Sequence, residues 1–131
     1  MENSILLNSG DKFFSIELLY NVENYLTFNV KIKSGKFSGE SNFCISEENI
    51  SLFIKKLSEM HNRLIGNCEL RDYDSDSYIN FEMIKLGHML VYGQIGGSHE
   101  EQFMRFKFET DQSILLNLIN IFKKAILAKF D

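Results

Sequence analysis

Residues 25–32 read YLTFNVKI, and this stretch decides the fold class because apolar and polar side chains alternate along it. Leu26, Phe28, Val30 and Ile32 share one face, and the residues between them share the other. A period of two indicates a β-strand with one buried face. The same alternation occurs on both sides of this stretch, with short turn-like breaks between the segments. We therefore predict that the first third of the chain forms an antiparallel meander.

The rest of the chain contains further alternating segments. Glycines at likely turn positions separate several of them, which is typical of hairpins. Together with the opening meander, the alternating segments predict strands at residues 13–20, 25–32, 36–45, 67–74, 77–86, 88–97 and 101–110.

Two segments show helical spacing of apolar residues instead. Ser46 is a suitable N-cap for a first helix whose apolar stripe continues to Leu64, and Gly66 would end it. Asp111 is a suitable N-cap for a second helix, whose apolar stripe begins at Leu115. The second helix is apolar around much of its circumference, so we expect it to be the more deeply buried of the two.

The predicted order is therefore β-β-β-α-β-β-β-β-α, an α+β fold in one domain over residues 1–131. The simplest architecture is a curved antiparallel sheet of about seven strands with both helices packed on one face.

Composition and charge exclude several classes of protein. The chain has 14 Lys and Arg against 18 Asp and Glu, a net charge of −4, which argues against direct binding of nucleic acid. The N-terminus lacks the pattern of a signal peptide, and the longest apolar stretch, residues 113–122, is far shorter than the ~20 residues that span a bilayer. Cys44 and Cys68 form no C-x-x-C motif, so we expect two buried free thiols. These features predict a cytoplasmic protein without a membrane role.

No motif for catalysis or cofactor binding is present. His61, His88 and His99 lack metal-ligand spacing, and the glycines of residues 93–97 form neither a dinucleotide-binding fingerprint nor a P-loop. No serine lies in a G-x-S-x-G context. We therefore predict no catalytic residue, no cofactor and no metal.

Asp72, Asp74 and Asp76 form a D-x-D-x-D pattern that requires a separate interpretation. An EF-hand loop would need glycine at its sixth position and glutamate at its twelfth, but Ser77 and Met83 stand there. Three alternatives remain: a solvated turn between strands, an acidic surface that binds a partner, and a metal site.

The distribution of charge favours the acidic surface among the functional alternatives. Residues 69–82 contain five acidic residues and one basic residue, and their sum of −4 equals the net charge of the whole chain. Tyrosines are interleaved with these acids, and tyrosine is enriched at protein interfaces. The predicted partner-binding residues, including two glutamates near the glycine-rich turn, are Asp72, Tyr73, Asp74, Asp76, Tyr78, Glu100 and Glu101.

The second half of the chain carries a resemblance to a known family. Its features are a strand that ends in a glycine, a later strand of the form L/M-x-F-x-F, and a Thr-Asp-Gln-Ser-x-Leu entry to the last helix. In the first half, paired strands lead into a Ser-Glu-Glu helix start. In these features the chain resembles the WapI-like family of bacterial immunity proteins, and the residues concerned are Gly93, Met104, Phe106, Phe108, residues 110–115 and residues 46–48.

The resemblance implies a cytoplasmic antitoxin that is not an enzyme. Such a protein binds the C-terminal toxin domain of a secreted polymorphic toxin, commonly a nuclease, and blocks it in the producing cell and its kin. The surfaces that face the toxin vary within the family, so no residue inherits a role from it, and the oligomeric state stays open.

Three other classes of function remain. The first is a small-ligand-binding domain that uses the concave face of the sheet as a pocket. The second is a metal-dependent enzyme centred on the three aspartates and His99. The third is a structural subunit of a larger assembly.

Overall fold

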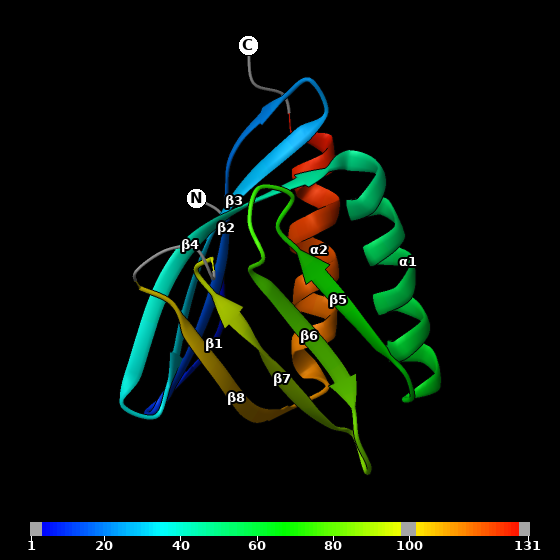
Figure 1. Cartoon of the computed structure of the whole chain (residues 1–131). Helices are drawn as coiled ribbons and strands as arrows, with labels where there is room; N and C mark the ends of the chain where they lie inside the picture. Colours follow the sequence, from blue (N-terminus) through cyan, green and yellow to red (C-terminus); the bar gives the residue numbers. More distant parts are fainter. Residues whose placement is uncertain (1–3, 98–101, 129–131) are drawn as a thin grey trace.

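The computed structural model describes residues 4–97 and 102–128, which form two four-stranded antiparallel sheets and two helices (Figure 1). The α+β class is confirmed. The elements in chain order are β1 (Ile5–Ser9), β2 (Lys12–Val22), β3 (Tyr25–Ser34), β4 (Phe37–Ser46), α1 (Glu47–Arg63), β5 (Asn67–Arg71), β6 (Tyr78–Met83), β7 (His88–Ile95), β8 (Met104–Asp111) and α2 (Ser113–Leu127).

The single seven-stranded sheet expected from the sequence is wrong in detail. Strands β1 to β4 pair in sequential order in one sheet, here called sheet A, and β5 to β8 do the same in a second, sheet B. The sequence analysis also missed β1, which pairs with β2 through an irregular register between Ile5 and Leu7. That irregularity breaks the alternation, and Leu6 is the only buried residue of the strand, so the period-two signal is weak there.

Aromatic side chains join the two sheets and the two helices in one core. Phe14 on β2 stacks on Phe81 of β6, with ring centroids 6.0 Å apart. Phe122 on α2 contacts Phe28 of β3 and Phe53 of α1 edge to face, at 5.1 and 5.3 Å. These five rings link both sheets to both helices, so the helices pack against the two sheets together and do not cover one face of a single sheet.

The first helix begins as predicted and ends earlier. The Ser46 hydroxyl accepts a hydrogen bond from the Asn49 N–H at 3.2 Å, and Glu47 and Glu48 lie in the first turn, where the helix dipole favours negative charge. The helix ends at Arg63 because Leu64 adopts the left-handed conformation, with φ of 57°. Gly66 was therefore not the residue that ends the helix.

The second helix is the more buried of the two, as expected: six of its residues are buried, against four in α1. Asp111 is the last residue of β8, and its Oδ1 accepts a hydrogen bond from the Ser113 N–H at 2.8 Å. Its hydrogen bonds with Ser113 lower the pKa of the Asp111 carboxyl from its ordinary value. Asp111 thus stabilises the start of α2 in its charged form, and this stabilisation is lost when the pH falls through the lowered pKa.

The strand glycine Gly93 is required for close pairing within sheet B. It pairs with Ile79 of β6. A Cβ at this position would collide with the Tyr78 carbonyl oxygen and would lie 3.0 Å from the Ile79 Cα. Both obstacles are backbone atoms held by the β-ladder, so neither can move without breaking strand pairing.

We expect Gly93→Ala to lower the free energy of unfolding by about 3 kcal/mol, because the new methyl group meets fixed backbone. Gly39→Ala is the matched control. Its Cβ would meet the flexible Met104 Sδ at 3.3 Å, so we expect a change below about 1 kcal/mol. Urea denaturation of both variants measures the difference. Equal stability of the two variants would contradict this account of Gly93.

Candidate partner-binding site

Asp72, one of the predicted partner-binding residues, points into the protein. Only 5% of its surface is exposed. Its Oδ1 accepts hydrogen bonds from the N–H groups of Cys44 and Asp74 at 2.9 and 3.1 Å, and its Oδ2 accepts one from the Ser75 hydroxyl at 2.6 Å. A buried carboxylate with these partners organises the loop between β5 and β6.

The same loop ties sheet B to the edge of sheet A. The Tyr73 N–H donates to the Cys44 carbonyl at 2.9 Å, while the Cys44 N–H donates to Asp72. Cys44 lies on β4, an outer strand of sheet A. Both of the backbone groups that Cys44 presents at this edge are therefore satisfied by residues of the loop between β5 and β6.

This attachment holds Tyr73 at the surface beside Tyr25. Their ring centroids are 5.6 Å apart, and 73% of Tyr73 and 40% of Tyr25 is exposed. Both rings line a surface hollow of about 370 Å³ that also reaches Asn49 on α1. We call the exposed set Tyr25, Tyr73 and Asp74 the tyrosine surface.

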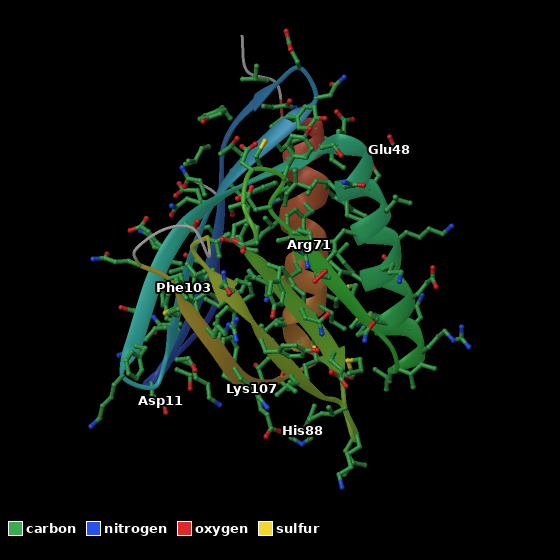
Figure 2. All side chains as sticks on the ribbon, in the orientation of Figure 1. Asp11, Glu48, Arg71, His88, Phe103 and Lys107 are labelled. Carbon is green, nitrogen blue, oxygen red and sulfur yellow. The ribbon has the colours of Figure 1, made fainter. Side chains whose placement is uncertain are left out.

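Acidic side chains lie around the tyrosine surface. Asp74 is exposed next to Tyr73. Tyr25 also lines a second hollow, of about 480 Å³, together with Glu47 and Glu48 in the first turn of α1. Figure 1 shows the β2–β3 turn, the loop after β5 and the start of α1 at one end of the molecule, and Figure 2 labels Glu48 there. Aromatic and acidic groups from three separate segments thus meet at this end.

Tyr25 is the residue that the sequence analysis missed. The alternation of residues 25–32 already placed Tyr25 on the outward face of its strand. Its neighbour Tyr73 is distant in the sequence, so no local pattern could show that the two rings meet. The hydrogen bond from the Glu47 N–H to the Asn24 carbonyl, at 2.8 Å, shows how the start of α1 is held against the β2–β3 turn.

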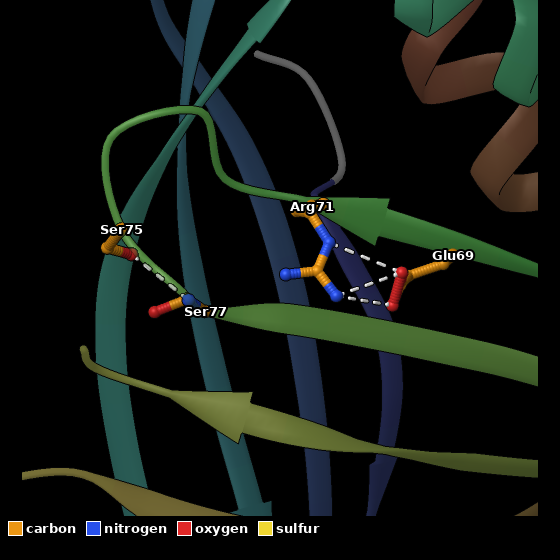
Figure 3. Close-up of polar contacts among 4 residues, drawn as sticks. All are labelled: Glu69, Arg71, Ser75 and Ser77. Atoms are coloured by element: carbon orange, nitrogen blue, oxygen red, sulfur yellow. Dashed lines mark hydrogen bonds and ion pairs between the residues drawn. The ribbon is translucent and has the colours of Figure 1, made fainter. Parts of the chain in front are cut away.

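The remaining predicted residues do not all join this surface. Tyr78 is half-buried on β6, where the Arg71 guanidinium lies 5.4 Å from its ring centroid. Arg71 also forms an ion pair with Glu69 at 3.0 Å (Figure 3). Asp76 is half-buried in the loop. Glu100, Glu101 and His99 lie outside the described residues.

The part of the chain that the structure describes holds no candidate metal centre and two free cysteines. Within residues 4–97 and 102–128, no group of three or more His, Cys, Asp or Glu side chains could hold a metal ion. Cys68 is buried, as expected, whereas Cys44 is half-buried, and both thiols are free. Burial raises the pKa of Cys68 to about 12, and burial together with the charge of Asp74 raises the pKa of Cys44.

The centre of the inner faces of the sheets, where a small ligand was the alternative hypothesis, is filled with side chains. Phe14, Phe81 and Phe108 meet there, with centroid distances of 6.0 and 6.4 Å. The hollows described above lie at the surface instead. This packing favours a role for the surface over a role for the interior.

The chain matches the sequence model of a known protein family. The sequence model of the immunity protein WapI-like family matches residues 5–130, nearly the whole chain. The chain belongs to the WapI-like family of immunity proteins. No curated protein and no solved structure is detectably similar to it.

Membership gives this WapI-like protein the role of an immunity protein, and an immunity protein acts by binding a toxin protein. Immunity protein families are generally non-enzymatic. None of the helices in the described part of the chain has the length and apolar character needed to cross a bilayer.

We expect Asp72→Ala to lower the free energy of unfolding by about 2 kcal/mol, because it leaves the Cys44 N–H and two donors of its own loop without their acceptor. Asp74→Ala removes an exposed carboxylate from the same loop and should change stability by less than about 0.5 kcal/mol. Urea denaturation compares the two. A stable Asp72→Ala protein would show that the loop does not depend on this carboxylate.

Proposed function

We propose that this protein binds and blocks the C-terminal toxin domain of a secreted polymorphic toxin in the cytoplasm of the producing cell, and that this toxin domain is a nuclease. The protein would thereby protect its own cell and its kin during contact-dependent competition. The observation that carries the proposal is the tyrosine surface: two exposed aromatic rings and a carboxylate held in place by hydrogen bonds of the loop backbone.

The chemistry of this surface fits a nuclease as the target. A nuclease needs a basic cleft to bind phosphates. The protein carries a net charge of −4, and Glu47, Glu48 and Asp74 add acidic groups around the tyrosines. Opposite charges on the two partners accelerate their encounter, while buried aromatic anchors slow dissociation. An acidic surface with tyrosines can therefore occupy a cleft that otherwise receives nucleic acid.

Co-expression tests the function directly. The probe is the C-terminal domain of a secreted toxin encoded by a neighbouring gene, produced in a bacterial host with and without the protein. We expect growth to stop without the protein and to recover with it, and nucleic acid to remain intact in the rescued cells. Rescue from a toxin that leaves nucleic acid intact when acting alone would contradict the nuclease target. Absence of rescue would contradict the role as its inhibitor.

Point variants test the surface itself. Tyr73→Ala should weaken binding to the toxin domain by about 2 kcal/mol if Tyr73 is an anchor. Asp74→Lys should slow association about tenfold at low salt, with a smaller effect at high salt. Asp11→Lys is the matched control, because Asp11 is also exposed but lies far from Glu48 (Figure 2). Equal association rates for the two charge reversals would assign the binding surface elsewhere.

A further inference from the structure

Of the four edge strands of the two sheets, β4, β5 and β8 can be compared by what covers their outward backbone groups. At the β4 edge of sheet A, the loop after β5 covers one position, where it binds the N–H and C=O of Cys44. At one edge of sheet B, Lys12 and Ser34 donate side-chain hydrogen bonds to the carbonyls of Glu109 and Lys107 on β8, at 2.9 and 3.1 Å. Unpaired strand edges invite pairing with another chain, and covering them prevents it.

The other edge of sheet B, strand β5, lacks such cover. The Met83 N–H donates to the Gly66 carbonyl, and the Asp72 N–H donates to the Ser77 carbonyl, one bond at each end of the β5–β6 ladder. Along an antiparallel ladder, the backbone N–H and C=O groups of successive residues point alternately toward the neighbouring strand and away from it. Those of Asn67, Glu69 and Arg71 therefore point away from β6. No described residue provides a backbone partner for these outward groups.

A groove lies along this open edge, between β5 and α1. Its volume is about 560 Å³, and its lining includes Leu52 and Lys56 of α1 and Cys68 and Leu70 of β5. It shares Asn49, Ile45 and Arg71 with the hollow beneath Tyr25 and Tyr73. The open edge is therefore continuous with the tyrosine surface.

We propose that an extended segment of the toxin domain lies in this groove and adds a strand to sheet B by pairing with the outward backbone groups of Glu69 and Arg71 on β5. This proposal rests on the proposed function and names the contact that the toxin makes. Strand addition supplies affinity through main-chain hydrogen bonds, and pockets beside the strand select its side chains.

The groove also indicates the chemistry of the added strand. Leu52 is 56% exposed on the α1 side, so an apolar side chain of the partner would bury it. Lys55 and Lys56 are exposed on the same wall, with Glu59 one turn further along α1. Arg71 is already paired with Glu69 (Figure 3). The two lysines therefore favour an extended segment that carries an acidic side chain beside an apolar one.

Amide hydrogen exchange of the whole protein, with and without the toxin domain, tests the pairing without a mutation. In the free protein, the amides of Glu69 and Arg71 should exchange quickly, while those of Cys68 and Leu70 are protected by β6. In the complex, the exchange of Glu69 and Arg71 should slow by about tenfold or more. Unchanged exchange at both positions in a complex that still forms would overturn strand addition and leave the inhibitor role intact.

A proline variant tests the outward N–H separately from the side chain. Proline is tolerated on an edge strand where its nitrogen faces away from the ladder. We expect Glu69→Pro to bind the toxin domain about tenfold or more weakly than Glu69→Ala, which keeps the N–H. Equal binding by the two variants, both folded by circular dichroism, would overturn the proposal. If Glu69→Pro does not fold, the exchange experiment on the unaltered protein decides.

A second copy of the chain is the other occupant that the open edge could take. Sedimentation of the protein alone distinguishes it. A dimer that Glu69→Pro dissociates and the toxin domain does not displace would overturn the proposal in favour of self-association. If the unaltered protein neither binds nor neutralises the toxin domain, both the proposed function and the strand addition fail together.

Discussion

The hydrogen bonds between Cys44 on β4 and the loop after β5 are the constraint on which the rest of the site depends. They join an outer strand of sheet A to a loop of sheet B through one backbone pair and one buried carboxylate. Because Tyr73 donates its own N–H to this contact, its ring is held beside Tyr25 and not left on a free loop. The chain has no proline with which to block a strand edge, and at Cys44 this loop covers the edge of β4 instead.

The alternation of residues 25–32 was enough to identify β3 and, with its neighbours, most of the strands. Period-two patterning reports which face of a strand is buried, but not which strands pair. The division into two sheets depends on where the chain goes after α1, and no local pattern encodes that. The short strand β1 escaped because one buried residue, Leu6, and an irregular register leave no alternation to read.

The candidate site was predictable only in part. Tyr73 and Asp74 are exposed as the charge pattern implied, but Asp72, which looks the same in sequence, is buried. The difference is that Asp72 has a donor from a distant strand, the Cys44 N–H, and such a partner is invisible in the D-x-D-x-D pattern. Tyr25 escaped for the same reason, since its importance comes from a ring that only folding brings near.

The two parts of the proposed interface would contribute different things to recognition. Main-chain pairing along β5 is available to any extended segment, so by itself it gives affinity without much selectivity. Selectivity must then come from side chains, and the tyrosine surface and the lysines of α1 flank the open edge with charges of opposite sign. A partner that satisfies both must present a basic region next to an acidic, extended one in a fixed order. A protein with only one of these regions would lose the contacts of either the tyrosine surface or the lysines. It would also leave the charges on that side without water and without a partner. This cost lets the surface distinguish its own toxin from others.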